Sequence, residues 1–216
     1  RVLYSRAAKD YSAMTASLVD DGIYKELSFR AESFSCCNAK GVSFQRVAFH
    51  SCDFSSSKLE GLDLSHCRFV DCTLANGAFS KAIVHETVFD GCRMTGSVWS
   101  ESYFRDVKIK NCKANCASFR FSDFRNCGFD DSSFFEAEFN GARFRGLLFN
   151  ELDLRRAEIT TSLKGMDLRS CRIEGLKAGL AELKGAIVDG EQAVIVCAQL
   201  GIEVKFFDHR IEDSLE

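Results

Sequence analysis

Large apolar residues recur at every fifth position from Phe29 to Ile159, and only Ala39 and Ala114 are small members of this series. A period of five matches neither the 3.6-residue period of an α-helix nor the two-residue alternation of a β-strand. The pattern therefore indicates a repeat of short structural units, and this repeat constrains the fold more than any local motif does.

A second position, two residues before each apolar centre, holds mostly small residues. Cys52, Cys67, Gly77, Ala82 and Ser97 are examples, and the remaining three positions of each unit are mainly polar or charged. A unit with one large and one small inward residue describes one flat side of a square coil. Four units then complete one coil of about 20 residues, and successive coils stack on each other.

The motif resembles that of the pentapeptide repeat family, in which a small residue is followed by Asp or Asn, by Leu or Phe and by two variable residues. The resemblance covers most of the chain, because one register is kept from Phe29 to Ile159. It implies an all-β fold, the right-handed quadrilateral β-helix, in which each coil contacts only its neighbours. It also implies an axis filled with large side chains, without a deep internal cavity.

The repeat divides the chain into four expected segments. Residues 1–26 do not keep the period and are expected to cap the first coil, with a turn at Asp20, Asp21 and Gly22. Residues 27–188 are expected to form the β-helix, with one residue deleted between Thr160 and Leu163. Residues 189–207 are predicted to form a C-terminal helix and strand, and residues 208–216 form a polar tail.

The C-terminal segment carries helix signals of its own. Asp189 and Gln192 have the spacing of a capping box, and Gly201 can end the helix. A short strand is expected after it. The resemblance to quinolone-resistance members of the family implies that this module joins two rods tail to tail in a homodimer, whereas capping of a monomer is the alternative. The predicted dimer interface consists of Ala193, Val194, Val196, Cys197, Leu200, Ile202, Val204 and Phe206.

Eleven cysteines raise the question of a metal or disulfide protein. Cys52, Cys72, Cys92 and Cys112 recur at the small inward position, which is typical of cysteine used as a small buried hydrophobe. A metal or redox ladder is the alternative, but no zinc-type spacing occurs and the histidines lie outside the inward positions. No metal site and no cofactor are therefore expected, and reduced thiols suit the cytoplasm.

Composition and motifs exclude several classes of function. The formal charge of −3 lacks the basicity of a nucleic-acid-binding protein, so no direct nucleic-acid partner is expected. No apolar run is long enough to cross a membrane. The sequence also carries no phosphate-binding glycine loop and no nucleophile signature, so an enzyme is not expected. What remains for function is the outer surface of the rod.

Acidic residues follow the repeat on this surface. Counting in steps of 20 places nine of them on two adjacent sides of the coil, where they are expected to approach one long edge: Asp63, Asp71, Glu86, Asp90, Asp106, Asp123, Asp130, Asp131 and Glu151. Arg105, Arg125 and Arg145 form a ladder on one of these sides and partly neutralise it. A solvated face without a partner is the alternative interpretation of each single charge.

The resemblance to quinolone-resistance pentapeptide proteins implies a function for this edge. Such a rod imitates DNA in shape and charge, binds DNA gyrase or topoisomerase IV, and protects the enzyme from quinolones or a related poison. The repeat contains no insertion through Ile159, so the chain is most similar to the members without projecting loops. The alternative function is a scaffold that binds another protein partner.

Overall fold

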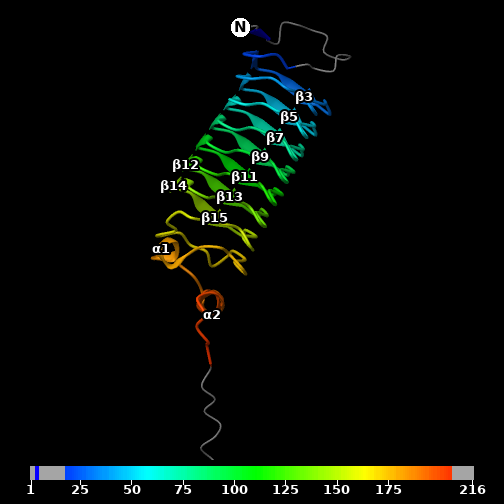
Figure 1. Cartoon of the computed structure of the whole chain (residues 1–216). Helices are drawn as coiled ribbons and strands as arrows, with labels where there is room; N and C mark the ends of the chain where they lie inside the picture. Colours follow the sequence, from blue (N-terminus) through cyan, green and yellow to red (C-terminus); the bar gives the residue numbers. More distant parts are fainter. Residues whose placement is uncertain (1–2, 5–17, 206–216) are drawn as a thin grey trace, which may run out of the picture.

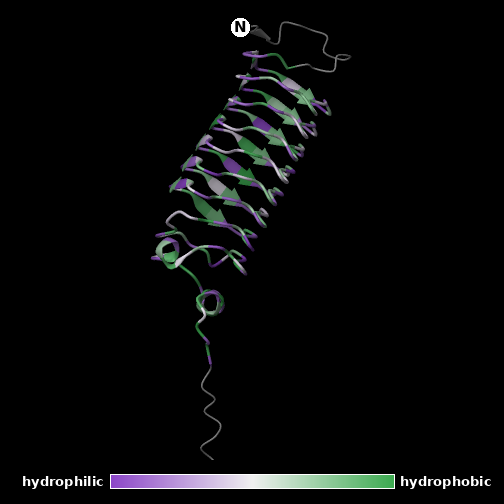
Figure 2. Ribbon diagram, in the orientation of Figure 1, coloured by the Kyte–Doolittle hydropathy of each residue, from purple (hydrophilic) through white to green (hydrophobic). Residues whose placement is uncertain are grey.

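The structure, a computed structural model, describes residues 3–4 and 18–205 of the chain. Four-sided coils stack into a rod, with two short helices at its C-terminal end (Figure 1). Figure 2 shows hydrophilic and hydrophobic residues alternating along the coils, as the five-residue repeat requires. The predicted all-β solenoid of the pentapeptide type is thus confirmed.

Two sides of the rod are parallel sheets of very short strands, because each side of a coil offers only about three residues in extended conformation. The sheet of side 1 contains β1 (Leu3–Tyr4), β2 (Ile23–Lys25), β4 (Ser43–Gln45), β6 (Asp63–Ser65), β8 (Ile83–His85), β10 (Tyr103–Arg105), β12 (Asp123–Arg125) and β14 (Arg143–Arg145). The sheet of side 2 contains β3 (Ser28–Arg30), β5 (Ala48–His50), β7 (Arg68–Val70), β9 (Val88–Asp90), β11 (Lys108–Lys110), β13 (Gly128–Asp130) and β15 (Leu148–Asn150).

The other two sides are joined by single parallel bridges. Side 3 carries the bridge series that includes Asp53 and Thr73, and side 4 carries the series that includes Ala78 and Val98. From Asp21 to Arg156 the residue at each corner takes a positive φ, for example 46° at Glu86. This left-handed conformation turns the chain sharply while the backbone continues to bond to the next coil.

Stacked aromatic rings fill the axis of the rod. Phe104 is fully buried and lies 4.7 Å from Phe124, with the two ring planes inclined by only 10°. Trp99 stacks on Phe79 at 4.5 Å, and its indole nitrogen donates a hydrogen bond to Ser97. Because the rings of successive coils stack in register, each coil covers the ring of the previous one, which explains why the large residues keep one register over successive coils.

The predicted deletion is confirmed by the register of the bridges. Asp153 pairs with Arg172 and Glu158 with Lys177, so the step shortens from 20 to 19 residues. Two hydroxyl groups compensate for the shorter coil. Thr160 Oγ1 accepts from the backbone of Gly141 at 2.9 Å, and Ser170 Oγ accepts from the backbone of Glu151 at 3.0 Å. These bonds satisfy amides that would otherwise lack a carbonyl partner.

The regular coil begins before residue 27, the expected start of the β-helix. β2 pairs with β4 in the same register as all later strands, and Tyr24 is a buried central residue that packs on Phe44 at 5.1 Å. The expected turn forms at Asp20 and Asp21. Residues 1–2 and 5–17 of the expected cap lie outside the described residues.

The C-terminal helix forms as expected. α2 spans Gly190–Gln199, and its start carries the full capping box: Asp189 accepts from the Gln192 backbone while the Gln192 side chain accepts from the Asp189 backbone. Gly201, with φ 76°, ends the helix. The backbone amides of Gly201 and Ile202 donate to Ala198 and Cys197, which is the Schellman arrangement.

Two details of this end differ from expectation. A short helix, α1 (Leu180–Leu183), interrupts the last coil of the solenoid, where no helix was expected, and the bridge between Asp167 and Ile187 follows it. The expected strand after α2 is wrong for the described residues 202–205, which have no assigned strand. A strand needs a neighbouring backbone for its hydrogen bonds, and this segment leads away from the last coil (Figure 1). Phe206 lies outside the described residues.

Candidate partner-binding surface

The predicted acidic residues lie along two edges of the rod, so the expectation that they approach one long edge is wrong. Glu86 and Asp106 occupy the corner between sides 1 and 2, here called edge 1–2, whereas Asp71, Asp131 and Glu151 occupy the corner between sides 2 and 3, here called edge 2–3. The remaining four lie within strands of the two sheets: Asp63, Asp90, Asp123 and Asp130. The width of side 2 separates the two edges.

Cations from neighbouring coils neutralise part of the acidic set. Asp90 lies 3.0 Å from Lys110 and 3.3 Å from Arg68, and hydrogen bonds from Asn111 and Lys110 lower the pKa of its carboxyl group. Asp123 is nearly buried and is surrounded by three arginines at 3.4–3.8 Å: Arg125, Arg143 and Arg145. Neither carboxylate presents a free negative charge to a partner.

Edge 1–2 is a ladder of opposite charges. Glu26 pairs with Arg46 at 2.6 Å, and Glu86 Oε2 lies 2.7 Å from His66 Nδ1. Asp106 lies 3.3 Å from Arg105. This edge is therefore close to electrically balanced, and it offers less attraction to a basic partner than the count of its acids suggests.

Edge 2–3 differs from edge 1–2 in how its acidic residues are paired. In residues 3–4 and 18–205, Asp71, Asp131 and Glu151 form no ion pair with lysine or arginine. Asp130, at the end of β13 beside this edge, accepts a hydrogen bond from the neutral side chain of Asn150. Edge 2–3 thus carries the exposed, uncompensated negative charge of the predicted set.

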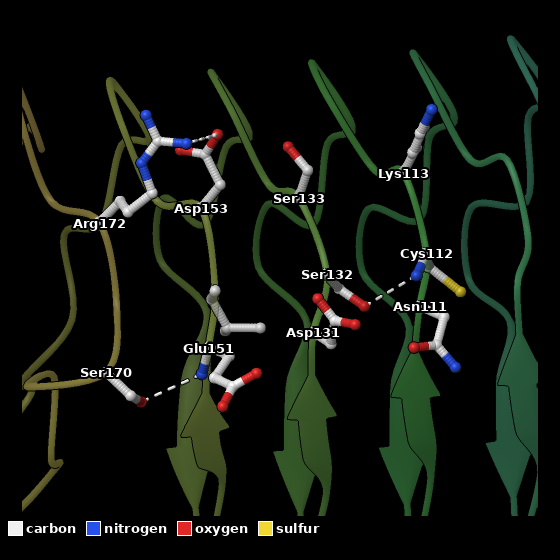
Figure 3. Close-up of a pocket in the computed structure, with 11 residues that line it drawn as sticks. Asn111, Cys112, Lys113, Asp131, Ser132, Ser133, Glu151, Asp153, Ser170 and Arg172 are labelled. Atoms are coloured by element: carbon white, nitrogen blue, oxygen red, sulfur yellow. Dashed lines mark hydrogen bonds and ion pairs between the residues drawn. The ribbon is translucent and has the colours of Figure 1, made fainter.

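A shallow groove of about 560 Å³ runs along the C-terminal part of this edge (Figure 3). Asp131 and Glu151 stand on successive coils along one side of the groove, and Asp153 and Arg172 line the other side. A hydrogen bond from Arg155 lowers the pKa of the Asp153 carboxyl group, so this acid is also ionised at neutral pH. The groove could accept a basic segment of a partner.

The cysteine ladder belongs to the core. Cys52, Cys72, Cys92 and Cys112 are buried, and all eleven cysteines are free thiols. Burial raises the pKa of the neighbouring Cys67 thiol to about 11, so it stays protonated and is a poor nucleophile at neutral pH. Cys36 and Cys116 are the exposed thiols, at corners of side 3. The interpretation of the ladder as buried packing is consistent with these positions.

The predicted dimer residues also separate into two groups. Val196 packs against the core of the last coil, and Ala193, Val194 and Cys197 are half-buried. Leu200, Ile202 and Val204 are exposed, with Ile202 exposing 53% of its surface. The helix therefore caps its own rod with one face, while the segment that follows it presents unpaired apolar side chains.

Two of the histidines outside the inward positions lie together in the structure. His66 and His85 have ring centroids 5.8 Å apart on edge 1–2. Counting in steps of 20 could have found this neighbourhood, because His66 precedes Glu86 by one full coil. The assignment of residues to inward and outward positions could not have found it, because it does not specify which outward side chains contact each other.

Comparisons with known proteins agree with the repeat. The family model described as "Pentapeptide repeat region" matches residues 42–119, and that described as "Pentapeptide repeats (8 copies)" matches residues 102–141. No curated protein matches the chain. In the described residues, neither helix has the length and hydropathy to cross a bilayer.

Several solved structures are similar to parts of this chain. HetL, a pentapeptide repeat protein involved in heterocyst differentiation regulation from Nostoc sp. strain PCC 7120, is 16% identical, with 78% of this chain and 88% of HetL covered and a TM-score of 0.39. Full-length QnrB1, a plasmid-mediated fluoroquinolone resistance protein, is 19% identical, with 84% of this chain and 100% of QnrB1 covered and a TM-score of 0.30. At these TM-scores neither likeness carries an argument about function.

Proposed function

We propose that the rod of this chain, in which residues 42–119 and 102–141 match models of pentapeptide repeats, binds a type II topoisomerase, DNA gyrase or topoisomerase IV, and protects it from quinolones or a related poison. The observation that carries this proposal is the unpaired acidic edge 2–3, where Asp131 and Glu151 border an open groove. The partner surface that fits such an edge is the basic surface on which the topoisomerase holds DNA.

Charge spacing limits how closely the rod can imitate DNA. B-DNA carries one charge per about 1.7 Å of its axis. Successive coils stack about 4.8 Å apart, so one acid per coil gives a lower linear charge density along a single edge. We therefore place the contact at the C-terminal stretch of edge 2–3, where Asp130 and Asp131 lie one coil before Glu151.

The mechanism requires binding alone. The rod would compete with DNA for the basic surface or destabilise the poisoned cleavage complex, without turnover and without a cofactor. A topoisomerase works on chromosomal DNA, so the proposed site of action is the cytoplasm of a bacterium. Direct binding of nucleic acid is not part of the proposal, since the same acids that attract the enzyme repel phosphates.

A scaffold for another protein partner is the second candidate. The ion pairs around Asp90 and Asp123 favour it, because a largely balanced surface imitates DNA poorly but suits a polar protein interface. The two candidates differ in one measurable property, namely whether gyrase responds to the protein.

The test is gyrase supercoiling across a titration of the full chain, with and without a fluoroquinolone. Restored supercoiling in the presence of the drug supports protection. Inhibition in both arms supports competition with DNA without protection. No effect in either arm contradicts the proposal and leaves the scaffold function.

A pair of charge-reversal variants locates the contact. Asp131→Lys combined with Glu151→Lys should abolish the effect on gyrase, because it reverses the unpaired charges of edge 2–3. Glu101→Lys combined with Glu138→Lys makes the same change in net charge on side 4 and at the edge where side 4 meets side 1, and it should leave the effect intact. Equal behaviour of the two variants would contradict a role for edge 2–3.

A further inference from the structure

A group of nitrogen and oxygen ligands converges on edge 1–2, outside the proposed topoisomerase contact. His66, His85 and Glu86 each offer one ligand atom, and these atoms all lie within 4.8 Å of one another. His66 Nδ1 lies 2.7 Å from Glu86 Oε2, and His85 Nε2 lies 3.5 Å from Glu86 Oε1. Asp106, one coil further along the same edge, lies 3.7 Å from His85 Nε2.

These separations match the edges of a metal coordination sphere. Zinc is bound by imidazole nitrogen at about 2.0–2.1 Å and by carboxylate oxygen at about 2.0–2.2 Å, which puts the ligands of a tetrahedral site roughly 3.3 Å apart. The observed separations lie on both sides of this value, so side-chain rotations alone could close the site. Two imidazoles with carboxylates are a ligand set that suits divalent transition metals.

The backbone holds the ligands in fixed positions. His66 and Glu86 are corner residues with φ of 55° and 46°, and the His66 amide donates to the His85 carbonyl at 3.0 Å. His85 is the last residue of β8, paired in register with Ser65 and Arg105. A metal at this point would therefore meet ligands that are already arranged on stacked coils, and binding would order few further groups.

One atom of the group lacks a partner. His85 Nε2 is buried and makes no hydrogen bond in the described part of the chain. A buried imidazole nitrogen without a partner is unfavourable, and it faces both Glu86 and Asp106. Neutral imidazole has a lone pair on one ring nitrogen, which is the electron pair that a metal ion requires.

We propose that edge 1–2 binds a divalent transition-metal ion of the Zn²⁺ type through His66, His85 and Glu86, with Asp106 in reach as the fourth ligand. Asp106 would exchange its contact with Arg105 for the metal. Because these residues lie on three successive coils, the ion cross-links the middle of the solenoid. The role is structural, and it is independent of the acidic edge 2–3.

The test uses the full chain after treatment with a chelator, with Zn²⁺ and Co²⁺ as probes. We expect one ion bound per chain by equilibrium dialysis and a rise in the thermal unfolding midpoint on addition of Zn²⁺. The Co²⁺ form should show visible bands of a four-coordinate ion without a thiolate-to-metal charge-transfer band. A strong charge-transfer band would place the ion on cysteine and overturn the proposal.

Variants distinguish this site from general binding to the surface. His66→Gln and Glu86→Gln should each weaken Zn²⁺ binding by more than the roughly 10–100-fold that loss of an outer-shell partner costs. His50→Gln is the matched control, because His50 ends β5 on side 2, away from this group. The affinity of this variant for Zn²⁺ should equal that of the parent chain. Absence of binding to the parent chain, or equal affinity in all variants, would overturn the proposal.

Discussion

At the residue scale, each side of a coil places one large and one small side chain inside the rod. The contacts of Gly77 show why the position two residues before each large side chain holds small residues. A Cβ atom at residue 77 would lie against the ring of Phe79, which is fully buried and stacked on Trp99. The position nevertheless tolerates larger side chains elsewhere, since Val42 and Leu62 occupy it in other coils and are also buried.

Gly77→Ala should therefore destabilise the protein by about 1–3 kcal/mol, because the added methyl group overpacks the ring stack. The matched control is Gly128→Ala, where a Cβ atom meets nothing within 4 Å. This control should be neutral or more stable by about 0.4–1 kcal/mol, since alanine restricts the unfolded chain. Denaturant unfolding of both variants measures the difference, and a stabilised Gly77→Ala protein would show that the ring can move aside.

At the element scale, a coil needs its neighbour on both sides, so the ends of the stack require a different solution. The Gln192 side chain supplies it at the C-terminal end. Its amide nitrogen donates to the carbonyls of Leu168 and Cys171, both at 2.7 Å, while its oxygen accepts from the Asp189 backbone. One side chain thus starts α2 and binds the helix to the last coils.

Gln192→Ala should leave two carbonyls of the last coils without these partners, at a cost of about 1–3 kcal/mol. Because a solenoid is stabilised by contacts between neighbouring units, we expect the loss to be local. Amide hydrogen exchange in residues 190–199 should accelerate while exchange in β9 and β11 stays slow. Glu191→Ala, at the exposed neighbouring position, is the control. Unchanged protection of α2 would contradict the role of Gln192.

At the scale of the whole molecule, the described part of the chain ends in apolar side chains that no other described residue covers. Leu200, Ile202 and Val204 are exposed beyond the helix, and the backbone of residues 202–205 belongs to no strand. A second copy of the chain could satisfy both needs by pairing the two segments. We propose this tail-to-tail homodimer, with Val196 serving the fold of each rod instead of the interface.

Leu200→Arg combined with Ile202→Arg should convert the dimer into a monomer, because two charges would enter the apolar contact. Light scattering after size-exclusion chromatography gives the mass of each species. Ile83→Arg, which alters an exposed apolar residue of β8 in the middle of the rod, should remain dimeric. A parent chain that stays monomeric at its highest soluble concentration would contradict the proposal.

The register of the core could be predicted because it depends on local sequence alone. Each unit carries its own large and small inward residue, so Phe104 and Phe124 can be assigned to stacked positions by counting. The deletion near Thr160 and the capping box at Asp189 are likewise visible as breaks and spacings. The strand after the helix was predicted wrongly, because alternation does not supply the pairing partner that a strand needs.

The five-residue period specifies a four-sided solenoid, since each unit supplies one large and one small inward residue for one side of a coil. The charge of the surface, in contrast, depends on contacts that form only in the folded rod. Asp90 and Asp131 occupy outward positions of the same repeat, yet Lys110 neutralises the first and no cation reaches the second within the described residues. Which outward side chains meet depends on corner geometry and on neighbouring coils, and the five-residue period does not constrain either.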